Sequence, residues 1–277
     1  MLRQPHLHEL DALIMEFWPV ALDLTRSAYP TYTDGVKTQA DFVQTVHRAA
    51  SEDWGEVLVH LRDGKVNGLL VVDVADDAYV SLHVCLTHAH QAECLGEVLA
   101  YLRQKHAGKI MWLGFSTENT DMLVFAEEKG FTLLDDTVNW NISIEDWQPA
   151  ATVCPVRRVS AENYEAFRAL WTDEDMYWNA DRIWAAMERW ILFVTGDRRG
   201  AVACLDEGGM LEIFGFQYRD GYDEGTHRAL MAACLNTARQ QGSKYLTYFA
   251  DREETAVMQS LGFHRVSDYR CYEIELS

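Results

Sequence analysis

The feature that most constrains the fold of this chain is an internal repeat. Residues 108–116 read Gly-Lys-Ile-Met-Trp-Leu-Gly-Phe-Ser and lead through an acidic stretch to a Gly-Phe pair at Gly130. Residues 242–250 read Gly-Ser-Lys-Tyr-Leu-Thr-Tyr-Phe-Ala and lead through another acidic stretch to a Gly-Phe pair at Gly262. A sequence that repeats over the length of a domain indicates two copies of one structural unit.

A second pair of segments extends the repeat upstream. Residues 57–72 and 191–205 each consist of two apolar runs around a central turn. A chain of 277 residues has room for two such copies, since domains commonly contain about 100 to 150 residues. We therefore predict two domains, residues 1–148 and 149–277, joined in a segment that prolines interrupt.

Each half alternates helical and strand patterns. Apolar residues at helical spacing predict an amphipathic helix over residues 91–106, and its counterpart over residues 226–240. Two apolar runs around Asp63 and Gly64 predict a hairpin, because this dipeptide tolerates the positive φ of a tight turn. Further helices are expected within residues 160–170 and 176–190, with a strand at 245–249.

The charge of the chain argues against several partners. There are 43 acidic and 24 basic residues, a formal net charge of -19, which repels nucleic acid and anionic membrane surfaces. No signal peptide or long apolar span is evident, and six scattered cysteines without a CxxC pair suit reduced thiols. We expect a cytoplasmic protein that binds neither nucleic acid nor membrane.

A histidine and cysteine cluster raises a metal site as one alternative. Imidazole and thiolate are ligands that zinc prefers, and five such residues fall close together: His83, Cys85, His88, His90 and Cys94. Their spacing matches no structural zinc pattern, and histidines at a strand end are commonly exposed polar residues. The prediction is that no metal is bound, and a metal hydrolase is the least favoured function.

The strand order and the helix-Gly-Phe-strand ending, both present twice, resemble the GNAT (Gcn5-related N-acetyltransferase) superfamily in a tandem form. The resemblance implies an α+β fold with two GNAT-like domains, each a mixed, mostly antiparallel sheet flanked by helices. It also implies transfer of an acyl group, usually acetyl from acetyl-CoA, to a primary amine of a small molecule or peptide.

In that family a loop of pattern [QR]-x-x-G-x-[GA] holds the CoA pyrophosphate at a helix N-terminus, where amide groups and the helix dipole suit phosphate. Tyr222, Gly225 and His227 take these positions in the second half, whereas the first half has no glycine there. Residues 1–150 also hold 23 acidic against 10 basic residues, and residues 151–277 hold 20 against 14. The predicted donor site is therefore in the second half: Phe216, Gln217, Tyr222, Asp223, Glu224, Gly225, Thr226, His227 and Asp251.

The resemblance also suggests catalytic residues. Glu212, in the run Leu-Glu-Ile-Phe, matches the glutamate that removes the amine proton in the family's histone acetyltransferases; an outward-facing strand residue is the equal alternative. Met258 stands where the family often has a proton-donating tyrosine, so the thiolate would leave as an anion or take its proton from water or from another residue, such as Tyr218 or Tyr222. Of these residues we choose Tyr218. The predicted catalytic residues are thus Glu212 and Tyr218.

Two functions remain open from the sequence. Tyr177 and Trp178 are expected to line the acceptor site of an N-acetyltransferase, whose acidic chain would favour a cationic amine. The alternative is a non-catalytic GNAT-like protein that binds an acyl-CoA or another ligand as a sensor or scaffold. The missing tyrosine and the altered donor loop motivate this alternative.

Overall fold

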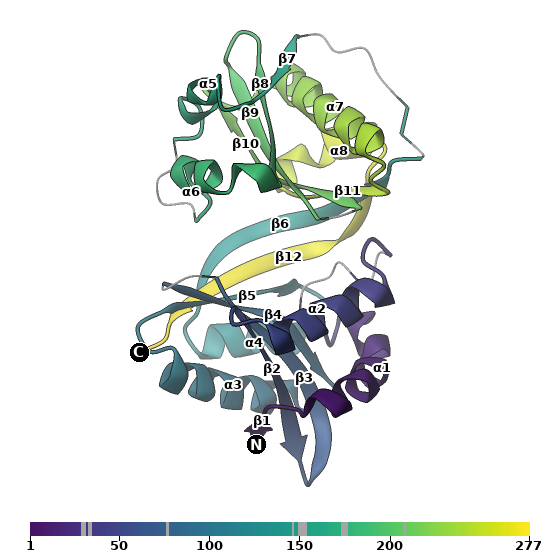
Figure 1. The fold of residues 1–277 in the computed structure, drawn as a ribbon, viewed down its shortest axis with the longest axis vertical. Helices are drawn as coiled ribbons and strands as arrows, with labels where there is room; N and C mark the ends of the chain where they lie inside the picture. Colours follow the sequence, from purple (N-terminus) through teal and green to yellow (C-terminus); the bar gives the residue numbers. More distant parts are fainter. Residues whose placement is uncertain are drawn as a thin grey trace. The chain divides into compact units, whose positions relative to one another are not determined.

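The computed structural model divides the chain into two compact units (Figure 1). The first unit comprises Met1–Val138 and Val266–Ser277, and the second comprises Asn139–Arg265. The residues that the structure describes are 1–28, 32, 35–75, 78–145, 147–148, 154–172, 177–207 and 209–277. Within this part of the chain, no helix combines the length and apolar character needed to cross a lipid bilayer.

The first unit is a mixed sheet with helices on both faces. Its strands follow the order β1-β2-β3-β4-β5-β12-β6, and only β4 and β5 run parallel among the pairs whose register is known. The elements are β1 (Leu2–Arg3), α1 (Leu10–Ala21), α2 (Gln39–Ser51), β2 (Gly55–Arg62), β3 (Lys65–Val74), β4 (Tyr79–Thr87), α3 (Gln91–Lys105), β5 (Ile110–Ser116), α4 (Thr120–Glu128) and β6 (Thr132–Ser143). Helices α1 and α2 pack on one face, and α3 and α4 on the other.

The second unit repeats this arrangement. Its strands follow the order β6-β11-β10-β9-β8-β7, and β10 and β11 form the parallel pair. The elements are β7 (Val156–Arg158), α5 (Tyr164–Arg168), α6 (Ala180–Ala185), β8 (Trp190–Thr195), β9 (Gly200–Asp206), β10 (Met210–Tyr218), α7 (Glu224–Gln241), β11 (Tyr245–Ala250) and α8 (Thr255–Ser260). The last strand of the chain, β12 (His264–Glu275), belongs to the first unit from Val266 onward. An apolar cluster lies between α5, α6 and one face of the sheet, and α7 packs against β8, β9 and β10.

The sequence patterns predicted the main elements. The expected α+β architecture, a mixed and mostly antiparallel sheet flanked by helices in each unit, is observed, and the predicted helices over residues 91–106 and 226–240 are α3 and α7. The hairpin forms where expected, with Asp63 at φ +52° and Gly64 at φ +75° between β2 and β3. Gly242 ends α7 in the left-handed conformation at φ +77°, which a residue without a Cβ adopts at no steric cost.

The two units do not follow the predicted division into residues 1–148 and 149–277. β6 enters the second unit at Asn139, while β12 enters the first unit at Val266 and pairs with β5 from Tyr269 to Glu275. The last strand of each half thus completes a unit built mainly from the other half. An apolar alternating pattern predicts a strand but not its partner, so the sequence did not indicate this exchange. Pro149 itself lies outside the described residues.

Tyr272 provides a test of the exchanged strand. Its ring is 4% exposed, packs in the core of the first unit and stacks on Phe115 at 5.6 Å between centroids. Tyr272→Ala should cost roughly 3 kcal/mol of unfolding free energy and lower amide hydrogen-exchange protection in β4 and β5. Phe263→Ala, a control in the second unit, should lower protection in β10 and β11 instead. Loss of protection in the second unit for Tyr272→Ala would contradict the assignment.

Candidate functional site

The parallel strands of the second unit separate part-way along their length. β10 pairs with β11 only from Met210 to Ile213, whereas its antiparallel pairing with β9 continues to Tyr218. The β9 register shifts between Ile213 and Gly215, which places a bulge at Phe214. Among the described residues, no backbone segment pairs with the other edge of β10 beyond this bulge. We call residues 214–218 along this side the open edge.

The first unit has the same separation, but its edge is filled. β4 pairs with β5 only from Tyr79 to Ser81 and continues to Thr87. On the edge that faces away from β3, the Ala28 N–H donates to the Cys85 carbonyl at 3.1 Å, and Ser27 forms an antiparallel bridge with Leu86. The chain thus supplies its own partner for β4.

Residues 23–28, which we call the inner segment, are held beside β4 by hydrogen bonds from side chains at the start of α3 and α4. The Asn119 amide donates to the Ser27 carbonyl at 3.2 Å, and both residues are buried. The Gln91 amide donates to the Arg26 carbonyl at 3.2 Å. Asn119 also accepts from the Met122 N–H as the N-cap of α4, so its orientation is fixed on both sides. A ligand could reach this edge only by displacing the inner segment.

The open edge of the second unit leads to the N-terminus of α7. Asp223 is the N-cap, and its carboxylate accepts from the Thr226 N–H at 2.8 Å. This backbone hydrogen bond holds the pKa of Asp223 below its usual value. Gly225 is the second residue of the helix and is partly exposed. The N-terminus of α7 therefore has the positive end of the helix dipole and a glycine, both of which suit an anion. One of its backbone N–H groups, however, is already bound by Asp223.

A buried polar chain lies behind the open edge. The Tyr218 hydroxyl is 2.7 Å from Nδ1 of His227, and this same nitrogen is 3.3 Å from Oε1 of Glu254. The Tyr248 hydroxyl donates to Oε2 of Glu254 at 2.9 Å. Four elements are joined in this way: β10, α7, the turn before α8, and β11.

Burial shifts the pKa values of this chain in opposite directions. Desolvation lowers the pKa of His227 to about 4 and raises the pKa of Glu254 to about 7. It also raises the pKa values of Tyr218 and Tyr248. His227 is therefore neutral near pH 7, while Glu254 exchanges its proton in the physiological range.

The two predicted catalytic residues lie on one strand but not at one place. Glu212 stands opposite Leu205 and Thr247, before the bulge, and is partly buried on the α5 and α6 face. Tyr218 is six residues further along β10, roughly 20 Å away at about 3.3 Å per residue, and its side chain turns to α7. The two groups cannot act on the same atom.

Aromatic rings surround the bulge on the face of Glu212. Phe214 is 37% exposed and meets Trp190 at 5.4 Å and Trp178 at 6.4 Å, each nearly perpendicular. Both residues predicted for the acceptor site adjoin this group: Trp178 is part of it, and the Tyr177 ring meets Trp178 at 5.0 Å and lies under the Arg182 guanidinium at 4.2 Å. Sequence reasoning missed Phe214, because only the register shift marks it as the bulge.

The predicted histidine and cysteine cluster does not converge on one point. The thiols of Cys85 and Cys94 hydrogen bond to each other in the core, which helps raise the pKa of Cys85. His88 contacts Glu16 at 3.0 Å, and His83 faces Asp73 at 3.6 Å. These side chains turn to different partners.

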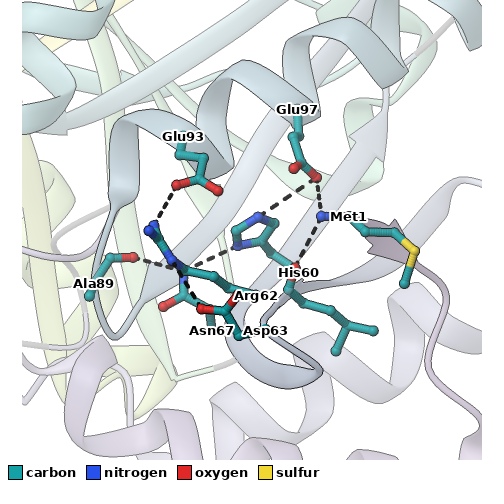
Figure 2. Close-up of polar contacts among 9 residues, drawn as sticks. Met1, His60, Arg62, Asp63, Asn67, Ala89, Glu93 and Glu97 are labelled. Carbon is teal, nitrogen blue, oxygen red and sulfur yellow. Dashed lines mark hydrogen bonds and ion pairs between the residues drawn. The ribbon is translucent and has the colours of Figure 1, made fainter.

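A different group, His60, Glu93 and Glu97, brings possible metal ligands together in the described part of the chain (Figure 2). The Asn67 amide nitrogen donates to the Ala89 carbonyl at 2.7 Å and lies 3.1 Å from Nδ1 of His60. Because this amide nitrogen is a donor, Nδ1 must accept, and the proton of the neutral ring is on Nε2, which faces Glu97 at 3.7 Å. A metal at Nε2 would move the ring proton to Nδ1, where it would oppose the amide hydrogens of Asn67, so the present arrangement does not favour a metal.

Comparisons with known proteins bear on the fold. No family model matches the sequence, and no curated protein matches it significantly. Solved structures do match over the whole chain. A GCN5-related N-acetyltransferase from Sphaerobacter thermophilus is 16% identical with a TM-score of 0.66, covering 100% of this chain and 95% of that one. The fold is that of the GCN5-related N-acetyltransferases.

Other structures with the GNAT fold agree in length. A tandem GNAT protein from the clavulanic acid biosynthesis pathway is 13% identical with a TM-score of 0.61, covering 100% of this chain and 99% of that one. An acetyltransferase of the GNAT family from Colwellia psychrerythraea is 13% identical with a TM-score of 0.53, covering 99% of each chain. At this identity the likeness concerns the fold.

Two buried side chains differ from those that the GNAT resemblance implies at their positions. Where the family's donor loop has a small residue, this chain has His227, whose buried ring packs against Phe216 at 4.3 Å between centroids. Met258, in place of the family's tyrosine, is fully buried and apolar. Asp251 gives its N–H to Oε2 of Glu254 at 3.3 Å. An imidazole and an apolar side chain thus stand where the resemblance implies a small residue and a tyrosine.

The buried carboxyl of Glu254 should make stability depend on pH. Its pKa is raised to about 7 in the folded state, so between its unfolded value and 7 the folded state binds more protons, and stability falls as pH rises. Glu254→Gln removes this loss. We expect the unfolding free energy of the variant, relative to that of the parent protein, to increase from pH 5 to pH 8. The gain at pH 8 should reach up to about 3 kcal/mol and is checked by measuring both proteins at both pH values. A difference that does not change with pH would refute the assignment.

Proposed function

We propose that this protein is an acyl-CoA-dependent N-acyltransferase, with acetyl-CoA as donor and a primary amine as acceptor, and that the second unit holds the site. The observation that carries the proposal is the open edge of β10 beside the N-terminus of α7. In the first unit the equivalent edge of β4 is taken by Ser27 and Ala28. Among the described residues, no segment takes the corresponding place beside β10.

The chemistry of the donor suits the open edge in part. The pantetheine arm of CoA carries amide groups, and an unpaired strand edge offers N–H and C=O groups to them. The pyrophosphate would lie over the first turn of α7, near Gly225, with Asp223 competing for the amide of Thr226. We therefore expect weak binding of the nucleotide end and a larger share of the affinity from the strand edge.

We assign Glu212 the role of base toward the acceptor amine. An alkylamine with a pKa of about 10.4 is almost fully protonated near pH 7, and only the neutral amine attacks a thioester. A carboxylate that removes this proton contributes about 10²- to 10⁴-fold. Glu212 faces the side of the sheet where Trp178 and Phe214 lie, which is the side proposed for the acceptor.

We give Tyr218 a binding role rather than a catalytic one. Its hydroxyl lies near the start of α7, with its ring 5.6 Å from that of Tyr222 and 2.7 Å between its oxygen and His227. A phenol there can contact a phosphate of the donor but is too far from the bulge to reach a leaving thiolate. With Met258 apolar, the thiolate takes its proton from water.

A second candidate function keeps the ligand but omits the reaction. The buried ring of His227 and the capping carboxylate of Asp223 both depart from the family's donor loop. These departures favour a protein that binds an acyl-CoA as a sensor or scaffold. A thiol-release assay with acetyl-CoA and a panel of amines separates the two: binding with no turnover on any amine favours the second function.

Gly225 and Ala92 offer a matched test of the donor site. Each is the second residue of the helix that follows the separated strands, α7 in the second unit and α3 in the first. Gly225→Phe should abolish the thermal stabilisation by acetyl-CoA, because the ring covers the first turn of α7, while Ala92→Phe should leave it intact. Equal loss in both variants would mean that the units do not differ as proposed.

The role of Glu212 has a pH-dependent signature. Glu212→Gln should bind acetyl-CoA normally but fall at least about 100-fold in rate at neutral pH, with partial recovery at high pH where the amine loses its own proton. Glu207→Gln, at an exposed acidic residue that follows β9, serves as the control. If Glu212→Gln matches the parent protein across the pH range, Glu212 is a structural strand residue.

A further inference from the structure

We propose that Glu254 acts through His227 as a positioning residue for Tyr218, and that its protonation state decides whether the Tyr218 hydroxyl offers a proton to a ligand at the open edge. The inference rests on the proposed function in one respect, namely that acetyl-CoA binds along this edge. The arrangement of the hydrogen bonds can be tested without any ligand.

The partners of Glu254 fix where its proton can be. Oε2 accepts from the Tyr248 hydroxyl at 2.9 Å and from the Asp251 N–H at 3.3 Å. Two donors already face Oε2, and one of them, the backbone N–H, cannot accept a proton in return. We therefore place the proton of protonated Glu254 on Oε1, the oxygen that faces Nδ1 of His227 at 3.3 Å.

When Glu254 is protonated, the imidazole must accept at Nδ1. The proton of the neutral ring is then on Nε2, and the one lone pair of Nδ1 is shared between the Oε1 hydroxyl of Glu254 at 3.3 Å and the closer Tyr218 hydroxyl at 2.7 Å, which donates to it. The Tyr218 proton points inward. In this state the hydroxyl can only accept a hydrogen bond from a ligand.

When Glu254 is ionised, the arrangement reverses. The ring carries its proton on Nδ1, which donates toward Oε1 of Glu254 and toward the Tyr218 oxygen. Tyr218 now accepts from the ring, and its own proton is directed outward. The hydroxyl can then donate to a phosphate oxygen of the donor.

The remaining groups around the pair support two neutral forms of the ring. His227 is fully buried, its Nε2 has no hydrogen-bond partner, and burial keeps its pKa near 4. The ring therefore changes tautomer and not charge above about pH 5. The titratable and charged groups that face the pair are Tyr218 from β10, Tyr222 and Asp223 from the loop, Glu224 and Arg228 from α7, Tyr248 from β11, and Asp251 from the turn before α8.

The tautomer of His227 is the direct readout. Nitrogen-15 NMR of the imidazole should show Nδ1 changing from unprotonated to protonated between pH 5.5 and pH 8.5. In Glu254→Gln the amide nitrogen faces His227, because Oε1 of the glutamine must accept from Asp251, so Nδ1 should stay unprotonated at every pH. One unchanged tautomer in the parent protein overturns the inference, whether or not acetyl-CoA binds.

Acetyl-CoA affinity supplies the second readout. Tyr218→Phe should weaken binding about tenfold at pH 8.5, the size of one lost hydrogen bond, and less than about twofold at pH 5.5. Comparing Tyr218→Phe with the parent protein at each pH cancels the repulsion between ionised Glu254 and phosphate, which both proteins share. Tyr222→Phe, at the exposed neighbour, should have the same effect at both pH values.

The outcomes separate the inference from the proposed function. An effect of Tyr218→Phe that is equal at the two pH values overturns the inference while acetyl-CoA binding stands. Persistence of the full pH dependence in Glu254→Gln, checked to be folded by circular dichroism, also overturns it. If the parent protein binds no acetyl-CoA at any pH, the proposed function fails, and the tautomer measurement alone decides the inference.

Discussion

A pair of parallel strands that separates part-way along its length is the constraint on which the rest of this structure depends. Beyond the point of separation, one edge of the longer strand carries N–H and C=O groups that need partners. In the first unit the inner segment supplies these partners to β4, and the side-chain amides of Asn119 and Gln91 donate hydrogen bonds to the backbone of that segment. In the second unit the edge of β10 from Phe214 onward has no such partner among the described residues.

Much of the fold could be predicted because its signals are local. The periodic apolar stripes of α3 and α7, the Asp63-Gly64 turn and the helix end at Gly242 each depend on a few neighbouring residues. The exchange of β6 and β12 could not be predicted, since a strand pattern does not specify which edge the strand joins. The inner segment gave no signal either: it has no periodicity, and only hydrogen bonds distant in sequence identify its role.

The sequence proposed single site residues but not their arrangement. Glu212, Tyr218 and Gly225 were proposed from the resemblance to the GNAT family, and the spacing along β10 separates Glu212 from Tyr218 by roughly 20 Å. His227 was identified as a departure from the donor loop, but its contacts with Tyr218 and Glu254 depend on how α7 and the turn before α8 pack. Glu254 was missed because an acidic residue in an acidic stretch has nothing in the sequence to mark its burial.

The central claim is that acetyl-CoA binds along the edge of β10 in the second unit and not along the edge of β4 in the first. Hydrogen exchange of the whole chain with and without acetyl-CoA tests it most directly, because it reads both edges in one experiment. The account predicts new protection in residues 214–218 and in the first turn of α7, with no change in residues 82–87 or in the inner segment. New protection along β4, or at both edges equally, would contradict it.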